Sequence, residues 1–264
     1  MLLLVSVRSG VEVESALAGG ADIIDAKEPT RGSLGPVSAP TLTEIVRHVP
    51  PGQAFSAAAG DVSTTEEVRV ALAENELPSR DGPTFLKLGF AGVRSPELVS
   101  NLLSTAVRLA ARQRSSPLII AVAYADSDRA GSLGTDDVCR LACEAGAGGI
   151  LIDTCIKDGA NLLSWMSLPA LARCVEDARA AGLVTALAGA LGPEHLTDVA
   201  AAQPDILGFR GAACDAGRAG RVSAERVARL RQGLRAASRN AGAWGISRPK
   251  TLLTYGKSTT RGLQ

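Results

Sequence analysis

The chain has 264 residues, of which 46% are hydrophobic and 21% are charged, so it can bury a sizeable core as one large domain or two small ones. Its 28 basic and 27 acidic residues leave a net charge of +1, and only 3% of the residues are aromatic. This balance argues against a surface for nucleic acid, which needs excess positive charge and stacking rings, and against a surface for anionic membranes.

The cysteines and histidines argue against a structural zinc site. None of the five cysteines forms a CxxC pair, and His48 and His195 are the only histidines. Residues 1–7 are too short for the apolar region of a signal peptide, and no run approaches the ~18 apolar residues that span a bilayer. We therefore expect a cytoplasmic protein that uses no metal and no cofactor.

Eight apolar segments have the composition of buried parallel strands, and a helical pattern follows each of them. The predicted strands are residues 1–7, 21–26, 54–61, 84–90, 117–125, 148–154, 183–189 and 204–211. The predicted helices are residues 11–17, 41–48, 64–75, 96–114, 136–145, 162–181, 193–202 and 223–237. His48 lies in the last turn of its helix, where a cation suits the helix dipole, and is interpreted as structural.

Eight strand–helix units without a linker are typical of a closed (β/α)₈ barrel. A doubly wound open sheet would need a glycine fingerprint after the first strand, and Val7-Arg8-Ser9-Gly10 is not one. We therefore predict an α/β protein with a single (β/α)₈ TIM barrel over residues 1–238. Residues 239–264 mix Gly, Ser, Pro and basic residues and are predicted to be a poorly packed tail.

The stretch at residues 19–29 places an acid and an amine at the end of a buried strand. Strand alternation puts Asp25 and Lys27 on the same side, one pleat apart. Burial favours the neutral amine, which is the form that attacks a carbonyl to make a Schiff base. A solvated Asp–Lys pair at the strand end is the alternative interpretation.

Other even-numbered strands carry polar residues at the same end. Lys87 lies in the fourth strand, Asp153 ends the sixth with Lys157 just beyond it, and Arg210 ends the eighth. Because barrel active sites form at the carboxyl ends of the strands, and even-numbered strands share layers, we expect these residues to converge on one mouth. A lysine that merely extends to the rim is the alternative for Lys87.

Glycine-rich turns follow the last two strands and predict a phosphate site. Small residues there let main-chain N–H groups approach phosphate oxygens, and an arginine can add a bidentate contact. The predicted contacts come from Gly189, Gly192, Arg210, Gly211 and Ala212. Ordinary turn glycines are the alternative interpretation.

Together these features predict an amine catalyst for a phosphorylated aldehyde or ketone. Crowded lysines lower one another's pKa, which helps to supply a neutral nucleophile, and a second amine can move protons at the carbon next to the imine. Asp25 and Asp153 would orient the lysines and shuttle protons.

The same residues resemble a known family. The chain resembles the (5-formylfuran-3-yl)methyl phosphate synthase family of methanofuran biosynthesis, also called 4-(hydroxymethyl)-2-furancarboxaldehyde-phosphate synthase. The similarity runs in order from about residue 1 to residue 234. The segments that carry it are Leu3-Leu4-Val5-Ser6, residues 19–27, Gly32-Ser33-Leu34-Gly35, residues 56–61, Lys87-Leu88-Gly89, Ala123-Tyr124-Ala125-Asp126, Asp153-Thr154, Lys157-Asp158-Gly159, Ala186-Leu187-Ala188-Gly189 and residues 210–214.

The resemblance implies a carbon–oxygen lyase that joins two glyceraldehyde 3-phosphate molecules, with loss of phosphate and water, to leave a furan aldehyde phosphate. By position, Lys27 matches the family's Schiff-base lysine and Lys87 its proton acceptor. Asp25, Asp153 and Lys157 match further residues needed for activity. The chain departs from archaeal members at Arg8, where they tend to have Pro-Lys, and in its tail.

Two alternatives stay open at this point. A class I aldolase or isomerase of triose phosphates would also form an imine, but it would not release inorganic phosphate from glyceraldehyde 3-phosphate. A non-catalytic sugar-phosphate-binding protein would give no product, although the full lysine set argues against it. We expect a homo-oligomer with a small phosphorylated aldehyde as its substrate and no nucleic-acid or membrane partner.

Overall fold

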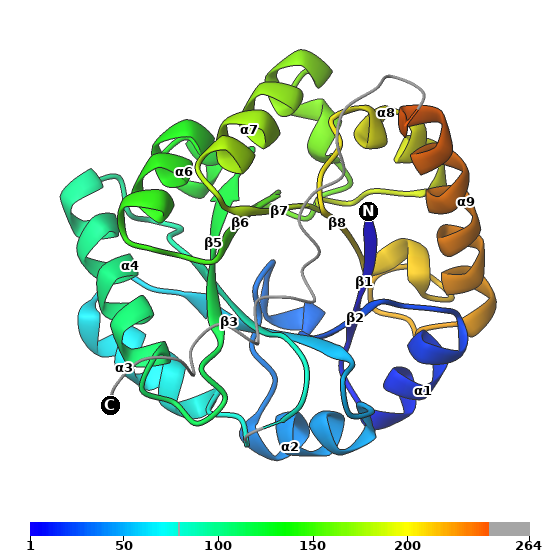
Figure 1. Ribbon diagram of the computed structural model, residues 1–264, viewed down its shortest axis with the longest axis horizontal. Helices are drawn as coiled ribbons and strands as arrows, with labels where there is room; N and C mark the ends of the chain where they lie inside the picture. The colour runs from blue at the N-terminus through cyan, green and yellow to red at the C-terminus, as the bar shows by residue number, and fades with distance from the viewer. Residues whose placement is uncertain (79, 243–264) are drawn as a thin grey trace, which may run out of the picture.

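Eight parallel strands form a closed barrel in chain order, as the sequence predicts (Figure 1). The computed structural model describes residues 1–78 and 80–242, with side chains up to residue 239. The strands are β1 (Leu2–Val7), β2 (Ile23–Ala26), β3 (Ala54–Asp61), β4 (Thr84–Gly89), β5 (Leu118–Tyr124), β6 (Gly149–Asp153), β7 (Val184–Leu187) and β8 (Ile206–Phe209). The last strand pairs with the first, Val5 opposite Phe209, which closes the barrel.

Helices surround the strands as an outer ring (Figure 1). The α-helices are α1 (Gly10–Ala18), α2 (Ala39–His48), α3 (Thr65–Glu74), α4 (Pro96–Ala110), α5 (Ser127–Ala130), α6 (Thr135–Glu144), α7 (Leu168–Ala180), α8 (Leu196–Ala201) and α9 (Ala224–Gly242). Short 3₁₀ turns are η1 (Pro29–Arg31), η2 (Leu162–Ser164), η3 (Pro193–His195) and η4 (Gly211–Ala213). Several helices begin at a Ser or Thr whose side chain accepts a first-turn N–H, as Ser95 does for α4.

Several predicted helix boundaries are wrong. The helix expected over residues 96–114 ends at Ala110, and the one expected over residues 193–202 is divided into η3 and α8. The helix expected over residues 162–181 is divided into η2 and α7, because Pro169 lacks an N–H and fits only a first turn, where Ser167 caps α7. Trp165 therefore lies between the two segments. The final helix continues to Gly242, past the predicted domain boundary at residue 238. Residues 243–264 of the predicted tail lie outside the described residues.

Side-chain alternation along the strands builds two apolar layers. Outward-facing residues such as Leu3 and Val5 pack against the helices in an outer core, while inward-facing residues such as Ile23, Phe85 and Leu151 fill the barrel interior. This inner core closes the barrel below its carboxyl end, so the space for a ligand lies above it. None of the helices in the described part of the chain is both apolar and long enough to span a bilayer.

The outer core predicts a large stability difference between two leucines of α4. Leu103 is fully buried, whereas Leu98 is 36% exposed. We expect Leu103→Ala to lower the free energy of unfolding by about 2 to 5 kcal/mol, because it leaves a cavity, and Leu98→Ala to lower it by less than about 1 kcal/mol. Urea unfolding followed by circular dichroism measures both. Equal midpoints for the two variants would contradict this packing.

Candidate active site

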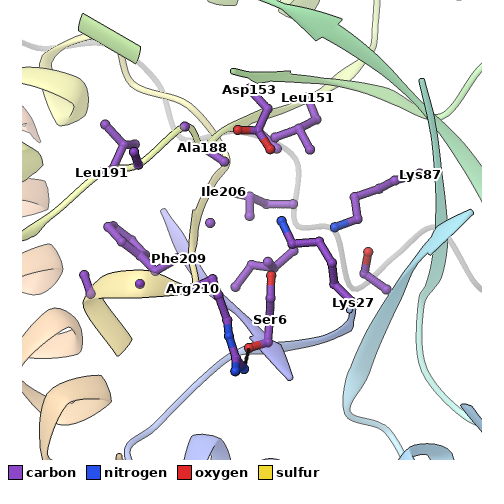
Figure 2. Close-up of a pocket in the computed structure, with 18 of the residues that line it drawn as sticks. Ser6, Lys27, Lys87, Leu151, Asp153, Ala188, Leu191, Ile206, Phe209 and Arg210 are labelled. Carbon is purple, nitrogen blue, oxygen red and sulfur yellow. Dashed lines mark hydrogen bonds between the residues drawn. The ribbon is translucent and has the colours of Figure 1, made fainter. Parts of the chain in front are cut away.

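A cavity of about 480 Å³ lies at the carboxyl end of the barrel (Figure 2), within the range of small-molecule sites. It forms there because the inward-facing side chains change from apolar to polar along the strands. The pairs that show this change are Leu4 and Ser6 on β1, Ile23 and Asp25 on β2, Phe85 and Lys87 on β4, and Leu151 and Asp153 on β6. The even-numbered strands thus bring their predicted polar residues to one mouth.

Lys87 and Asp25 form a buried ion pair. The Lys87 Nζ lies 2.6 Å from Asp25 Oδ1, and the Ser6 hydroxyl donates to Asp25 Oδ2 over 2.6 Å. Asp25 is fully buried and Lys87 is 4% exposed. Lys87 therefore turns inward to a carboxylate and does not extend to the rim. Removing either partner of such a buried pair alone lowers stability, because it leaves a buried charge without compensation.

Lys157 and Asp153 form a second pair. The Lys157 Nζ lies 2.7 Å from Asp153 Oδ1 and also donates to the Thr154 hydroxyl at 2.9 Å. Burial by itself would raise the pKa of Asp153, but the charges of Lys157 and Lys27 outweigh burial and lower it. Asp153 is therefore an ionised carboxylate at neutral pH.

Lys27 differs from both of these lysines. Its side chain is 8% exposed, and its Nζ has no hydrogen-bond or ion-pair partner in the described part of the chain. Burial lowers the pKa of Lys27 to about 8, with the positive charge of Lys87 acting in the same direction and the carboxylates of Asp153 and Asp25 acting against it. Figure 2 shows the amines of Lys27 and Lys87 directed into the same cavity, across from Asp153. Lys27 is thus the lysine that most readily becomes a neutral nucleophile.

The loop that carries Lys157 is fixed from β5. Asp126 is 2% exposed, and its two carboxylate oxygens accept the N–H groups of Cys155 (2.6 Å) and Ile156 (3.0 Å). Beyond Lys157, Arg129 donates to the Asp158 carboxylate over 2.7 Å. The sequence analysis gave Asp126 no role. Its position immediately after a predicted buried strand could have indicated a role at the barrel mouth.

The turns after β7 and β8 carry main-chain N–H groups without acceptors. Among the described residues, the N–H groups of Gly189, Gly211 and Ala212 donate to no carbonyl or side chain, which leaves them able to bind an anion. Gly189 has φ +107°, and a Cβ there would lie 3.2 Å from Thr154, so this position requires glycine. The N–H of Gly192 instead donates to His195 Nδ1 over 2.9 Å.

Arg210 does not serve as the predicted phosphate contact. Its Nη1 and Nη2 donate to the Glu12 carboxylate at 2.5 and 3.1 Å. Nη1 also donates to the Ser6 carbonyl (3.0 Å), Nη2 to the Gly220 carbonyl (2.7 Å) and Nε to the Arg218 carbonyl (3.1 Å). All five N–H groups are therefore used within the protein, and the guanidinium is turned toward the Ser6 main chain (Figure 2). Arg210 joins β8 to β1 and α1.

Arg218 is a cavity-lining cation that the sequence analysis missed. It follows η4 in the loop that leads to α9, and its side chain lines the cavity with Lys157 and Gly211. The only sequence signal was its place a few residues after the predicted phosphate turn.

Metal-ligand clusters are not found among the described residues, in which no three His, Cys, Asp or Glu side chains converge. The five cysteines are free thiols. The cavity can therefore offer amines, carboxylates and main-chain N–H groups, which are the means of imine chemistry on an anionic carbonyl compound.

The contrast between the lysines predicts opposite effects on stability. Because the pKa of Lys27 is about 8 in the folded protein and 10.5 is its ordinary value, the unfolded chain binds more protons between these pH values, and stability rises with pH across that window. Lys27→Met should raise the free energy of unfolding at pH 7 by about 3 kcal/mol, and the gain should shrink toward pH 10.5.

Lys87→Met is the matched variant and should lower the free energy of unfolding by about 3 to 5 kcal/mol, because it leaves Asp25 buried without a partner. Urea unfolding at pH 7 and pH 10 measures both variants. A destabilised Lys27→Met would show that the Lys27 amine has a partner at rest.

Comparison with known proteins identifies the family. The family model for 4-HFC-P synthase matches residues 3–231. The chain is 35% identical over 235 residues to the (5-formylfuran-3-yl)methyl phosphate synthase of Methanothermobacter thermautotrophicus, covering 88% of this chain and 98% of that protein. It is 36% identical to the protein of the same name from Methanocaldococcus jannaschii, over 88% of this chain and 99% of that one.

Solved structures share the fold at low sequence identity. Phosphoribosyl anthranilate isomerase from Thermus thermophilus superposes with a TM-score of 0.59 at 16% identity, covering 89% of this chain and 99% of that one. A 3-hexulose-6-phosphate synthase superposes with a TM-score of 0.55 at 16% identity, covering 90% of this chain and 99% of that one. At this identity the likeness concerns the barrel alone. The family match and the two synthase relatives confirm the resemblance, and the chain belongs to the (5-formylfuran-3-yl)methyl phosphate synthase family.

Proposed function

We propose that this protein condenses two molecules of glyceraldehyde 3-phosphate into 4-(hydroxymethyl)-2-furancarboxaldehyde phosphate, releasing one phosphate and two waters, through a Schiff base on Lys27. The observation that carries the proposal is the buried Lys27 amine, which lacks a carboxylate partner among the described residues and has a pKa of about 8. Family membership supports a synthase of methanofuran-type cofactor biosynthesis and the lyase class.

Lys27 performs the first covalent step. Its neutral amine attacks the aldehyde carbon of one substrate, and the resulting carbinolamine loses water to give an imine. Lys157 is suited to protonate the departing oxygen because the Asp153 carboxylate holds it 2.7 Å away. The ionised Asp153 also stabilises the positive charge that develops on the imine nitrogen.

The Lys87–Asp25 pair takes the proton from the carbon next to the imine. The imine draws electrons from that carbon, so its proton becomes acidic and its loss leaves a nucleophilic enamine. The Lys87 ammonium first passes a proton to the Asp25 carboxylate 2.6 Å away, and the neutral amine so formed accepts the proton from carbon. Ser6 fixes the Asp25 carboxylate by its hydrogen bond, which keeps Lys87 on the cavity side.

The turns after β7 and β8 bind a substrate phosphate. Main-chain N–H groups of Gly189, Gly211 and Ala212 supply the contacts, in a place where a side chain would hold the oxygens away. Gly192 supports this turn through its bond to His195. The expected cytoplasmic location and homo-oligomeric state stay predictions.

The triose-phosphate aldolase or isomerase and the non-catalytic binding protein are separated from the synthase by one experiment. The protein is incubated with glyceraldehyde 3-phosphate, released phosphate is measured, and a second sample is reduced with borohydride and mapped by mass spectrometry. We expect phosphate release and a modified Lys27. An imine without phosphate release would favour the aldolase, and neither signal would favour the binding protein.

Two lysine variants test the assigned roles. Lys27→Arg should abolish both the trapped imine and phosphate release, because a guanidinium is never neutral in a protein. Lys87→Gln should keep trapping at Lys27 but lower phosphate release by about 10²- to 10⁴-fold, the range for a lost general base. Circular dichroism checks that each variant is folded. Unchanged turnover in Lys27→Arg would refute the mechanism.

Asp126 gives a prediction about Lys157. Asp126→Asn replaces one accepting oxygen by an NH₂ that faces a loop N–H, so Lys157 should be displaced and kcat should fall about 10-fold or more with little change in KM. Trapping at Lys27 should persist. Asp128→Asn, on the exposed surface of α5, is the matched control. Equal turnover in the two variants would mean that the Asp126 bonds do not position Lys157.

A further inference from the structure

Two triose phosphates would bring two phosphate groups into one cavity, and each needs positive charge close by. Of the cationic side chains that line the cavity, Lys87 and Lys157 are paired with carboxylates, and Arg210 has no N–H group left to donate. Lys27 is the proposed nucleophile. Among the described residues that line the cavity, Arg218 is the remaining cation.

We infer that Arg218 binds a substrate phosphate and sets the enzyme's preference for phosphorylated aldehydes. This inference rests on the proposed function, which places a phosphorylated carbonyl compound in the cavity. It assigns to Arg218 the contact that the sequence analysis expected of Arg210.

The main chain of Arg218 lies beside the proposed phosphate turn. A Cβ built on Gly211 would lie 3.6 Å from the main-chain nitrogen of Arg218. The loop therefore folds back over the start of η4. The Arg218 carbonyl accepts from Arg210 Nε over 3.1 Å, and Arg210 is itself held by Glu12. The buried Arg210–Glu12 pair therefore fixes the main chain from which Arg218 extends.

The guanidinium of Arg218 is anchored at one nitrogen. Its Nη2 donates to the carbonyls of Pro29 (2.9 Å) and Gly32 (2.5 Å). Within the described ranges, the three N–H groups of Nε and Nη1 donate to no acceptor, and no carboxylate lies within ion-pair distance. A half-buried guanidinium with unused donors and no counter-ion is suited to bind the oxygens of a phosphate.

The electrostatic surroundings of Arg218 agree with this role. Arg218 lines the same cavity as Asp153. Burial lowers the pKa of Arg218, and the charges of Asp153 and Glu28 act against that effect. A guanidinium stays charged even when its pKa is lowered in this way. A bound anion would therefore offset the free-energy cost of burying that charge.

Arg218 also links the phosphate to the nucleophile. Pro29 and Gly32, whose carbonyls accept from Arg218, lie in the segment that follows β2 and Lys27. A phosphate bound by Arg218 would therefore fix the guanidinium and the segment beside Lys27 together. With the phosphorylated aldehyde bound, its phosphate and the segment after Lys27 would thus be held by the same side chain.

Imine trapping with two aldehydes tests the inference on the full-length chain. Half-saturating concentrations for borohydride trapping at Lys27 are measured with glyceraldehyde 3-phosphate and with unphosphorylated glyceraldehyde. Loss of a charged hydrogen bond predicts a rise of about 10- to 100-fold for the phosphorylated aldehyde in Arg218→Ala and no rise for glyceraldehyde. Arg218→Lys keeps the positive charge but not the two-pronged donor geometry of the guanidinium. Its half-saturating concentration for glyceraldehyde 3-phosphate should lie between those of the parent protein and Arg218→Ala.

The matched control is Arg221→Ala, an exposed arginine of the same loop, which should leave both values unchanged. If Arg218→Ala weakened trapping of both aldehydes equally, its role would be to support the loop and the inference would fail. The inference would also fail if neither value changed. Arg218→Gln, which retains donors to the Pro29 and Gly32 carbonyls, provides a second variant should Arg218→Ala not fold.

Calorimetric titration with inorganic phosphate needs no reaction and separates this inference from the proposed function. Arg218→Ala should weaken phosphate binding about 10-fold or more, whereas Arg221→Ala should bind as the parent protein does. Equal binding by all three proteins would overturn the role of Arg218. A parent protein that binds phosphate but releases none from glyceraldehyde 3-phosphate would overturn the proposed function and leave Arg218 as a phosphate ligand.

Discussion

The site depends on the burial of one amine that pairs with no carboxylate among the described residues. Lys27 lies between two lysine–carboxylate pairs, and each carboxylate is already committed at 2.6 or 2.7 Å to another lysine. Because the nearest negative charges are shared in this way, they only partly offset burial, and the pKa of Lys27 falls to about 8. A third carboxylate paired with Lys27 would have kept the amine protonated and unable to attack a carbonyl.

The barrel supplies this arrangement through strand geometry. Side chains on alternate residues face the interior, and neighbouring parallel strands bring their carboxyl ends to one level. The register sets Ser6 beside Asp25 and Asp25 beside Ser56, while Lys87 reaches Asp25 from β4. The inner apolar core beneath them removes water from this layer, which strengthens each charge interaction. Rigid strands thus carry Lys87, Asp25 and Asp153, and Lys27 follows its strand directly.

Loops complete the site, and charged side chains hold them. Asp126 and Arg129 fix the segment around Lys157 from β5, and the Arg210–Glu12 pair fixes the segment after β8. Charged side chains fix these loops through hydrogen bonds and ion pairs, because loops have few apolar residues to bury. The same cavity therefore contains arginines of two kinds. Arg210 has all its donors satisfied by the protein, and Arg218 has donors left for a ligand.

The barrel and the residues at its mouth can be predicted from local sequence patterns. Eight apolar segments with a helical pattern after each one predict parallel strands, and a period of two places Asp25, Lys27, Lys87 and Asp153 inward at the carboxyl ends. Local rules suffice for this because side-chain direction follows from the backbone. They failed at residues 162–181, where a proline started a second helix, and at the end of α9.

Which charged groups are partners depends on the three-dimensional arrangement of the whole chain. Glu12 and Arg210 are 198 positions apart, and no periodicity indicates that one satisfies the other. The same holds for the pairing of Lys87 with Asp25, which leaves Lys27 without a partner in the part of the chain that the structure describes. It also holds for the bond from Arg218 to the Pro29 carbonyl after Lys27. Pairing depends on distances of a few ångströms across the barrel, and these are set by packing of the whole chain rather than by any local pattern.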